Sequence, residues 1–161
     1  MIHTVKPEDA SNIATIYNHY IKHSITTFEE QTITAQEMQH SIAMASENYP
    51  WFVFETDGEL AGYAYASPWK SRCSYRFSAE TTIYLSSDHH RKGIGFELYS
   101  HLLEALKKTP CHSLIAAIAL PNEASIALHE KLAFEKVGHF KEVGWKFGKW
   151  IDVGYWEQLI H

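Results

Sequence analysis

The sequence predicts an α/β protein in which helices cover the faces of a mixed sheet. Short runs with strand character alternate with longer amphipathic runs, in the order β-α-α-β-β-β-α-β-α-β-β. The run Leu114–Leu120 is apolar throughout, which is typical of a strand covered on both faces. The chain has 161 residues, of which 45% are hydrophobic, so we expect a single domain over residues 1–161 with a core of its own.

The first half of the chain predicts a strand, two helices and a hairpin. Residues 2–5 alternate as a strand does, and Pro7 with the two acids after it favours a helix start. The apolar face of that helix, at helical spacing, is Ile13, Ile16, Tyr17 and Tyr20. Thr34 and Glu37 have the spacing of a capping box, which begins a second helix with Met38, Ile42 and Ala45 facing inward. Residues 51–55 and 60–67 predict a hairpin around Asp57-Gly58.

The second half predicts strands and helices in alternation, then a final strand pair. Residues 77–85 form a strand and residues 93–107 a third helix, which packs down through Ile94, Leu98, Leu102, Leu103 and Leu106. The apolar run at 114–120 leads into a fourth helix over 122–132. The pattern favours two final strands, Phe134–Phe140 and Trp145–Gln158, with a break between them.

Composition argues against several classes of function. The formal net charge of −5 does not suit a nucleic-acid-binding protein, which needs a basic excess to neutralise phosphates. Neither Cys-x-x-Cys nor His-Glu-x-x-His occurs, so we expect no metal, and Cys73 and Cys111 are too isolated for a disulfide framework. The chain shows no signal peptide and no apolar run near 18 residues, so we expect a cytoplasmic protein without a membrane partner.

A glycine turn joins the strand that ends at Leu85 to the third helix. A helix start offers free amide N–H groups and a positive dipole end, and Gly93 and Gly95 leave a ligand room to approach, so the turn predicts a pyrophosphate cradle. Arg91 and Lys92 add two cations beside it. The third glycine of a dinucleotide fingerprint and a Walker-type Gly-Lys-Ser/Thr are missing, and an ordinary turn before a helix is the alternative.

A second motif follows the apolar run, with the spacing Asn-x-x-Ser-x-x-x-His-x-x-x-Ala-Phe from Asn122 to Phe134. Together with the glycine turn it resembles the GNAT superfamily of acyl-CoA N-acyltransferases. The superfamily turn pattern is Gln/Arg-x-x-Gly-x-Gly/Ala, and this chain has His90 in the first place. The later superfamily pattern is Asn-x-x-Ala-x-x-x-Tyr-x-x-x-Gly-Phe, and the chain departs from it at Ser125, His129 and Ala133. Residues 16–20, 69–72, 120–122 and 144–154 resemble the phosphinothricin N-acetyltransferase family, a likeness that covers nearly the whole chain.

The resemblance implies a fold and a cofactor site. The sheet is then mostly antiparallel, with two central parallel strands that splay apart and helices on both faces. Acetyl-CoA enters the gap as co-substrate, and its pantetheine pairs with the exposed strand edge from Thr82 to Leu85, where Ile83, Tyr84 and Leu85 are the expected contacts. The amides and cations of the turn bind its pyrophosphate, through Arg91, Lys92, Gly93, Ile94, Gly95 and Phe96. Asn122 caps the fourth helix, and by the resemblance it also holds the pantetheine.

Two side chains are candidates for the chemistry. Glu80 lies one strand repeat before the predicted acyl-CoA edge, and a carboxylate inside a sheet should have a raised pKa and accept a proton directly or through water. The alternative is a solvated Glu at the sheet edge. His129 occupies the place where many superfamily members carry a Tyr that protonates the departing thiolate. It is a candidate acid or a hydrogen-bond donor to sulfur, and the alternative is a half-buried structural His.

The acceptor pocket is predicted from an aromatic and basic set, Phe28, Trp69, Arg72 and Tyr75. The Arg72 guanidinium can pair bidentately with a substrate carboxylate, and the alternative is a solvated loop Arg. Lys146 and Trp150 are candidates to close the pocket from the last strands, across a dimer interface. Tyr17 and Tyr20 are expected in the core.

These observations predict an acetyl-CoA-dependent N-acetyltransferase that acts on the α-amine of a small amino-acid-like acceptor by direct transfer with a general base. The resemblance implies phosphinothricin, methionine sulfoximine or methionine sulfone as acceptors. We also expect a homodimer. Polyamines or protein N-termini are alternative acceptors, and a non-catalytic acyl-CoA-binding sensor is an alternative of another class.

Overall fold

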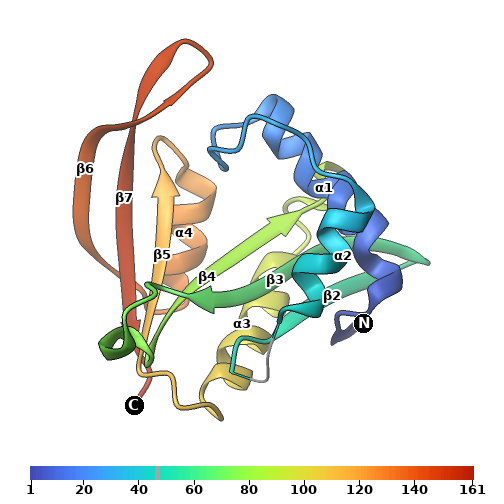
Figure 1. Cartoon of the computed structure of the whole chain (residues 1–161), viewed down its shortest axis with the longest axis horizontal. Coiled ribbons are helices and arrows are strands. Elements are labelled where there is room, and N and C mark those ends of the chain that lie inside the picture. The colour runs from blue at the N-terminus through green and yellow to red at the C-terminus, as the bar shows by residue number, and fades with distance from the viewer. Residues whose placement is uncertain (46–47) are drawn as a thin grey trace.

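A seven-stranded sheet runs through the computed structural model, which describes residues 1–45 and 48–161 (Figure 1). Its strands are β1 (Ile2–Thr4), β2 (Trp51–Thr56), β3 (Glu59–Pro68), β4 (Ser78–Leu85), β5 (Ser113–Ala119), β6 (Glu135–Lys146) and β7 (Lys149–Leu159). They lie in the order β1-β2-β3-β4-β5-β7-β6. The β4–β5 pair is parallel and every other neighbouring pair is antiparallel, which confirms the predicted mixed, mostly antiparallel sheet.

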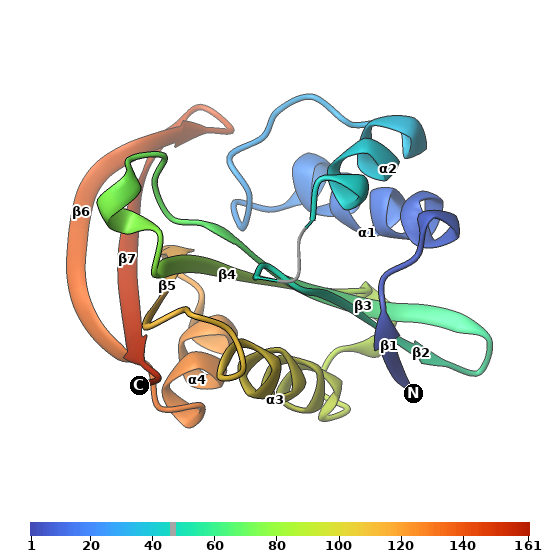
Figure 2. The ribbon, with the colours of Figure 1, turned by 60° about the horizontal axis from the view of Figure 1, so that its bottom comes forward.

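Helices cover both faces of the sheet, as predicted (Figure 2). On one face lie α1 (Ala10–His23) and α2 (Ala35–Ala43), and on the other lie α3 (Ile94–Leu106) and α4 (Glu123–Lys131). The capping box is present, because Thr34 Oγ1 accepts from the Glu37 amide at 3.1 Å and the Thr34 amide donates to Glu37 Oε2 at 2.7 Å. At the start of α4, Asn122 Oδ1 accepts from the Ser125 amide at 3.1 Å.

The two parallel strands separate soon after they pair. β4 and β5 are in register from Ser78 to Glu80 against Ser113 to Ile115. Beyond that point β4 continues to Leu85 and β5 to Ala119 without pairing to each other, while their outer neighbours, β3 and β7, stay in register. The predicted splay is therefore present, and it leaves residues 81–84 of β4 without a strand partner on the side toward β5. The Leu85 carbonyl is occupied, because it accepts a hydrogen bond from the Tyr20 hydroxyl at 2.7 Å.

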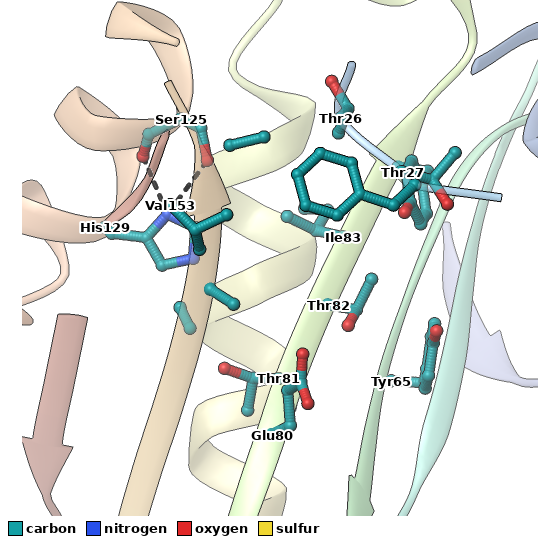
Figure 3. A pocket seen from close by; sticks show the side chains of 15 residues that line it. Thr26, Thr27, Tyr65, Glu80, Thr81, Thr82, Ile83, Ser125, His129 and Val153 are labelled. Atoms are coloured by element: carbon teal, nitrogen blue, oxygen red, sulfur yellow. Dashed lines mark hydrogen bonds between the residues drawn. The ribbon is translucent and has the colours of Figure 1, made fainter. Parts of the chain in front are cut away.

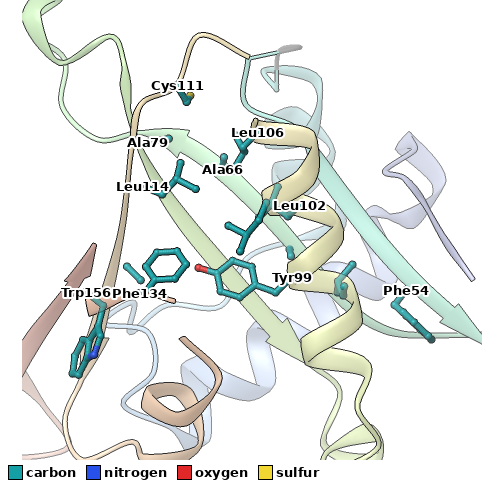
Figure 4. Close-up of a cluster of buried hydrophobic side chains, with 14 of the residues drawn as sticks. Phe54, Ala66, Ala79, Tyr99, Leu102, Leu106, Cys111, Leu114, Phe134 and Trp156 are labelled. Atoms are coloured by element: carbon teal, nitrogen blue, oxygen red, sulfur yellow. The ribbon is translucent and has the colours of Figure 1, made fainter. Parts of the chain in front are cut away.

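Each face of the sheet has its own core. The larger core lies between the sheet and α3, where Tyr99, Leu102 and Leu106 are fully buried (Figure 4). The smaller core lies under α1 and α2 and is rich in aromatic rings, with Tyr63 and Tyr84 buried and Tyr17 and Tyr20 packed against them. The prediction that Tyr17 and Tyr20 belong to a core is confirmed.

The break between the last two strands was predicted at residues 141–144, and this position is wrong. β6 continues through residues 141–144 and the chain turns at Phe147-Gly148, where both φ angles are positive, 53° and 72°. The alternation of side chains along β6 is interrupted before the turn, because the register of β6 against β7 shifts between Phe140 and Gly144. This shift is a β-bulge. Ala45 is likewise not on the inner face of α2, because that helix ends at Ala43; Met38 and Ile42 are buried as predicted.

Candidate active site

The gap between β4 and β5 is hollow and holds a pocket of about 250 Å³ (Figure 3). Residues from β4, β5, α4, the α1–α2 connection and the neighbouring strands β3 and β7 line it. They are Thr26, Thr27, Phe28, Tyr65, Glu80, Thr81, Thr82, Ile83, Tyr84, Ala116, Ala117, Ala119, Ser125, His129 and Val153. The structure thus brings five predicted site residues together: Glu80, His129, Phe28, Ile83 and Tyr84.

Side chains from both faces of the sheet line the pocket, because successive side chains of β4 point to opposite sides. Thr81 points toward α3, where its Oγ1 lies 2.6 Å from the hydroxyl of Tyr99. Tyr84 points the other way and packs in the core under α1. Glu80 has the same parity as Tyr84, so the candidate base faces the α1–α2 side while α4 supplies His129 from the opposite side. Two substrates that approach from opposite faces can therefore meet in the gap.

Glu80 has the electrostatics of a base. Burial raises the pKa of its carboxyl, and the nearby Lys70 ammonium opposes that rise. Tyr65 pairs with Thr82 across β3 and β4, and burial raises the pKa of Tyr65 to about 12, so its hydroxyl stays neutral in the pocket. Glu80 is thus a partly buried carboxylate near the neutral hydroxyl of Tyr65 and one ammonium, that of Lys70. Its burial favours the base over the solvated alternative.

His129 is more deeply buried than the half-buried alternative assumed, with 4% of its surface exposed. Its Nδ1 lies 2.7 Å from the Ser125 carbonyl oxygen, and its Nε2 lies 3.0 Å from the Tyr99 hydroxyl. Burial lowers the pKa of His129. Since a carbonyl oxygen only accepts, the proton of the neutral ring sits on Nδ1 and Nε2 accepts from Tyr99. Both ring nitrogens are therefore engaged within the protein.

The glycine turn keeps the predicted form at Gly93 but not at Gly95. Gly93 precedes α3 with φ +79°, and a Cβ there would meet no atom within 4 Å, so it is an open position. Gly95 is buried, and a Cβ there would lie 3.2 Å from Leu85 Cδ1 and 3.6 Å from Leu128 Cδ2. Gly95 therefore lets α3 approach β4 and α4, and the idea that it leaves room for the ligand is wrong.

The turn still fits a pyrophosphate through its backbone. The first bond of α3 runs from the Glu97 amide to the Gly93 carbonyl at 3.1 Å, so the amides of Ile94, Gly95 and Phe96 lack an acceptor within the helix. The side chain of Ile94 is buried, so this residue offers the backbone alone. Arg91 and Lys92 are exposed beside the turn. Free amides, a helix dipole and two cations together suit a phosphate ligand.

The predicted acceptor residues are divided between the pocket and a loop. Phe28 lines the pocket, whereas Trp69, Arg72 and Tyr75 belong to the β3–β4 connection and are not part of its lining. Trp69 packs edge-on against Tyr155 with ring centroids 5.9 Å apart. Arg72 and Tyr75 are exposed. The connection stands on the α1–α2 side of the sheet, the side that Glu80 faces (Figure 2).

Lys146 and Trp150 do not close the pocket in this chain. Lys146 is 1% exposed, and its Nζ donates to the carbonyls of Ser24 and Thr27 at 2.7 Å each. Burial lowers the pKa of its ammonium, against the raising effect of Glu30 and Glu29. Trp150 is exposed and packs on Trp145. Lys146 instead fixes the segment that carries Thr26, Thr27 and Phe28 into the pocket lining.

Sequence reasoning missed several lining residues, among them Thr26, Thr27, Tyr65, Val153 and Ser125. One of these carried a usable signal, because Ser125 lies one helical turn before His129. The others reach the pocket through strand register or through a loop, which no local pattern encodes.

Neither a metal site nor a membrane helix is found in the described part of the chain. No group of three or more His, Cys, Asp or Glu residues in it is placed to hold a metal ion. None of its helices is both long and apolar enough to cross a membrane.

Comparison with known proteins matches the chain to one family. The family model described as an acetyltransferase (GNAT) domain matches residues 2–154. The phosphinothricin N-acetyltransferase of Streptomyces viridochromogenes is 40% identical over 157 residues, which cover 96% of this chain and 86% of that protein. The L-methionine sulfoximine/L-methionine sulfone acetyltransferase of Salmonella typhimurium is 32% identical over 148 residues, 91% of this chain and 86% of that protein.

A solved structure of the same family has the same fold as this chain. The phosphinothricin acetyltransferase of Sinorhizobium meliloti, solved in complex with acetyl-CoA, superposes with a TM-score of 0.94 at 34% identity, over 99% of this chain and 87% of that one. The chain therefore belongs to the GNAT acetyltransferase family. It is an N-acetyltransferase of the phosphinothricin and methionine sulfoximine type.

Proposed function

We propose that this protein transfers the acetyl group of acetyl-CoA to the α-amine of a small amino-acid-like acceptor. The observation that carries the proposal is that a partly buried carboxylate, Glu80, and the unpaired edge of β4 share one pocket. Acetyl-CoA supplies the acetyl group and a thiol leaving group when bound. The relatives named above act on phosphinothricin and on methionine sulfoximine or sulfone, which are our candidate acceptors here.

The residues in and around the pocket have different roles in direct transfer. Glu80 accepts a proton from the acceptor ammonium, directly or through water, and so frees the nitrogen lone pair. The edge of β4 and the amides at the start of α3 hold the donor, while Phe28 and the β3–β4 connection hold the acceptor. The new C–N bond forms as the C–S bond breaks, and CoA leaves as a thiolate. The nitrogen loses its second proton as the amide forms, and the thiolate takes up a proton to become the free thiol. Because both substrates are held together, no covalent enzyme intermediate is needed.

A screen of amines with acetyl-CoA, read as release of free thiol, tests this function. Phosphinothricin, methionine sulfoximine and methionine sulfone should be acetylated faster than a polyamine or a peptide N-terminus. Faster turnover of the polyamine or the peptide would transfer the assignment to that acceptor class. If the protein binds acetyl-CoA but releases no thiol with any of the amines, it is a sensor and not an enzyme.

Arg72 is proposed to read the carboxylate of the acceptor. It is exposed on the side of the sheet that Glu80 faces, and a guanidinium offers a planar fork to a carboxylate. Loss of such a charge-assisted contact typically costs about 1.5–3 kcal/mol. Arg72→Ala should therefore lower kcat/KM for methionine sulfoximine by roughly tenfold to a hundredfold, and leave its decarboxylated analogue nearly unaffected. An equal loss on both acceptors, or on neither, would contradict this role.

The assembly and location remain predictions. A homodimer is consistent with the β6–β7 hairpin, where large apolar side chains are exposed at Phe140, Val143, Trp145, Phe147 and Trp150. Sedimentation velocity at micromolar concentration measures this directly. We also propose that residues 1–161 act as a single catalytic domain and that the protein works in the cytoplasm, which fractionation of cells can test.

A further inference from the structure

A hydrogen-bonded chain crosses the interior beside the pocket and has a hydroxyl at each end. Thr81 Oγ1 lies 2.6 Å from the Tyr99 hydroxyl, which lies 3.0 Å from His129 Nε2. On the other side of the ring, Nδ1 lies 2.7 Å from the Ser125 carbonyl and 3.3 Å from Ser125 Oγ (Figure 3). Thr81, His129 and Ser125 line the pocket, whereas Tyr99 is fully buried behind them.

The directions of these hydrogen bonds follow from the Ser125 carbonyl. Because the carbonyl only accepts, Nδ1 of His129 carries the ring proton and Nε2 accepts from the Tyr99 O–H. The Tyr99 oxygen is then left to accept from the hydroxyl of Thr81. The neutral imidazole keeps no N–H for the pocket, so His129 is badly placed to donate a proton or a hydrogen bond to a leaving sulfur.

Ser125 has the donor that His129 lacks. It is the third residue of α4, so the carbonyl four residues back belongs to Pro121, outside the helix, and the usual back-bond of a helical serine is not formed. Among the residues that the structure describes, its Oγ has one neighbour within hydrogen-bonding distance, Nδ1 of His129, which is itself a donor. The Ser125 oxygen accepts from that ring, and its own proton is left for a group in the pocket.

We propose that Ser125 is a catalytic residue that donates a hydrogen bond to the departing thiolate, and that His129 and Tyr99 are positioning residues that orient its hydroxyl. The inference rests on the proposed function, because it needs a thioester in the gap. The hydroxyl stabilises negative charge as the C–S bond breaks, at the first turn of α4, where the helix dipole acts in the same sense. No proton has to leave Ser125 for this effect.

The test measures the pKa of the CoA thiol bound to the protein, by ultraviolet absorbance of the thiolate in the binary complex with CoA. A hydrogen bond to the thiolate lowers that pKa. Ser125→Ala should raise the bound-thiol pKa by about one to two units, a tenfold to hundredfold loss of thiolate stabilisation. Ser125→Thr keeps a hydroxyl and should restore most of the effect. Tyr99→Phe keeps the ring packing and should raise the bound-thiol pKa by a smaller amount.

Two controls make the outcome specific. Glu80 is the carboxylate of the lining, so the titration is repeated in Glu80→Gln to remove its charge. Desulfo-CoA, which lacks the sulfur, should bind equally to wild type and to Ser125→Ala. An unchanged thiol pKa in Ser125→Ala, or an equal loss of desulfo-CoA affinity, overturns the role of Ser125. A wild-type protein that binds no CoA would instead refute the proposed function itself.

Discussion

Replacing Glu80 with glutamine is expected to lower turnover by about 10²- to 10⁴-fold, the usual contribution of general acid–base catalysis. Glutamine keeps the shape of the side chain and removes the proton acceptor. Acetyl-CoA affinity should stay close to that of the wild type, because Glu80 faces the side opposite α4 and lies before the free edge of β4. The measurement is kcat by thiol release, with CoA binding by calorimetry as the control.

The pH profile separates a base from a structural carboxylate. Burial raises the pKa of Glu80, so the wild-type rate should fall on the acidic side at a pH above that of an ordinary glutamate. Lys70 lowers the same pKa, and Lys70→Gln should therefore move this acidic limb to higher pH. In Glu80→Gln the limb should vanish. A variant that keeps both the rate and the limb would assign Glu80 a structural role.

The stability of Glu80→Gln offers an independent check that lost activity is not lost folding. The folded-state pKa of Glu80 is raised, so the folded protein holds this proton more tightly than the unfolded chain does. Its contribution to stability is present below the unfolded pKa and is lost as the pH rises through the folded pKa. Glutamine stays neutral throughout, so at neutral pH the variant should unfold at a temperature no lower than that of the wild type.

The elements of this fold were largely predictable because each is encoded locally. The capping box at Thr34, the cap at Asn122 and the helical period of α3 all depend on residues within a few positions of one another. The hairpin turn at Phe147-Gly148 was missed because the bulge in β6 interrupts the two-residue period before the turn is reached. The register of β4 against β5, which opens the gap, has no local signal and came from the family resemblance.

The candidate site was predictable where one element carries it and obscure where several meet. Glu80, Ile83 and Tyr84 lie on one strand, β4, and the sequence read together with the family resemblance identified all three as candidates. Phe28 reaches the same pocket through a long-range contact, since its ring occupies the space where a Cβ on Gly144 would stand. Gly95 shows the converse: a motif position was recognised, and its physical reason proved to be packing rather than room for a ligand.

Gly93 offers the sharpest test of the cofactor cradle, because the turn is open there and a matched pair of variants exists. The backbone is left-handed at φ +79°, a conformation that Asn and Asp tolerate better than most other residues. Gly93→Asn and Gly93→Asp share size, backbone strain and the ability to cap α3, and they differ by one negative charge.

The aspartate should weaken CoA binding about tenfold to a hundredfold relative to the asparagine, about 1.4–2.8 kcal/mol. Its carboxylate repels the pyrophosphate and competes for the amides of Ile94, Gly95 and Phe96, which have no acceptor within α3. The gap between the two variants should shrink as salt is added, because the repulsion is screened. Calorimetric titration with CoA at low and high salt measures both effects. Equal affinities for the two variants would place the pyrophosphate away from this helix start, and the cradle assignment would be lost with it.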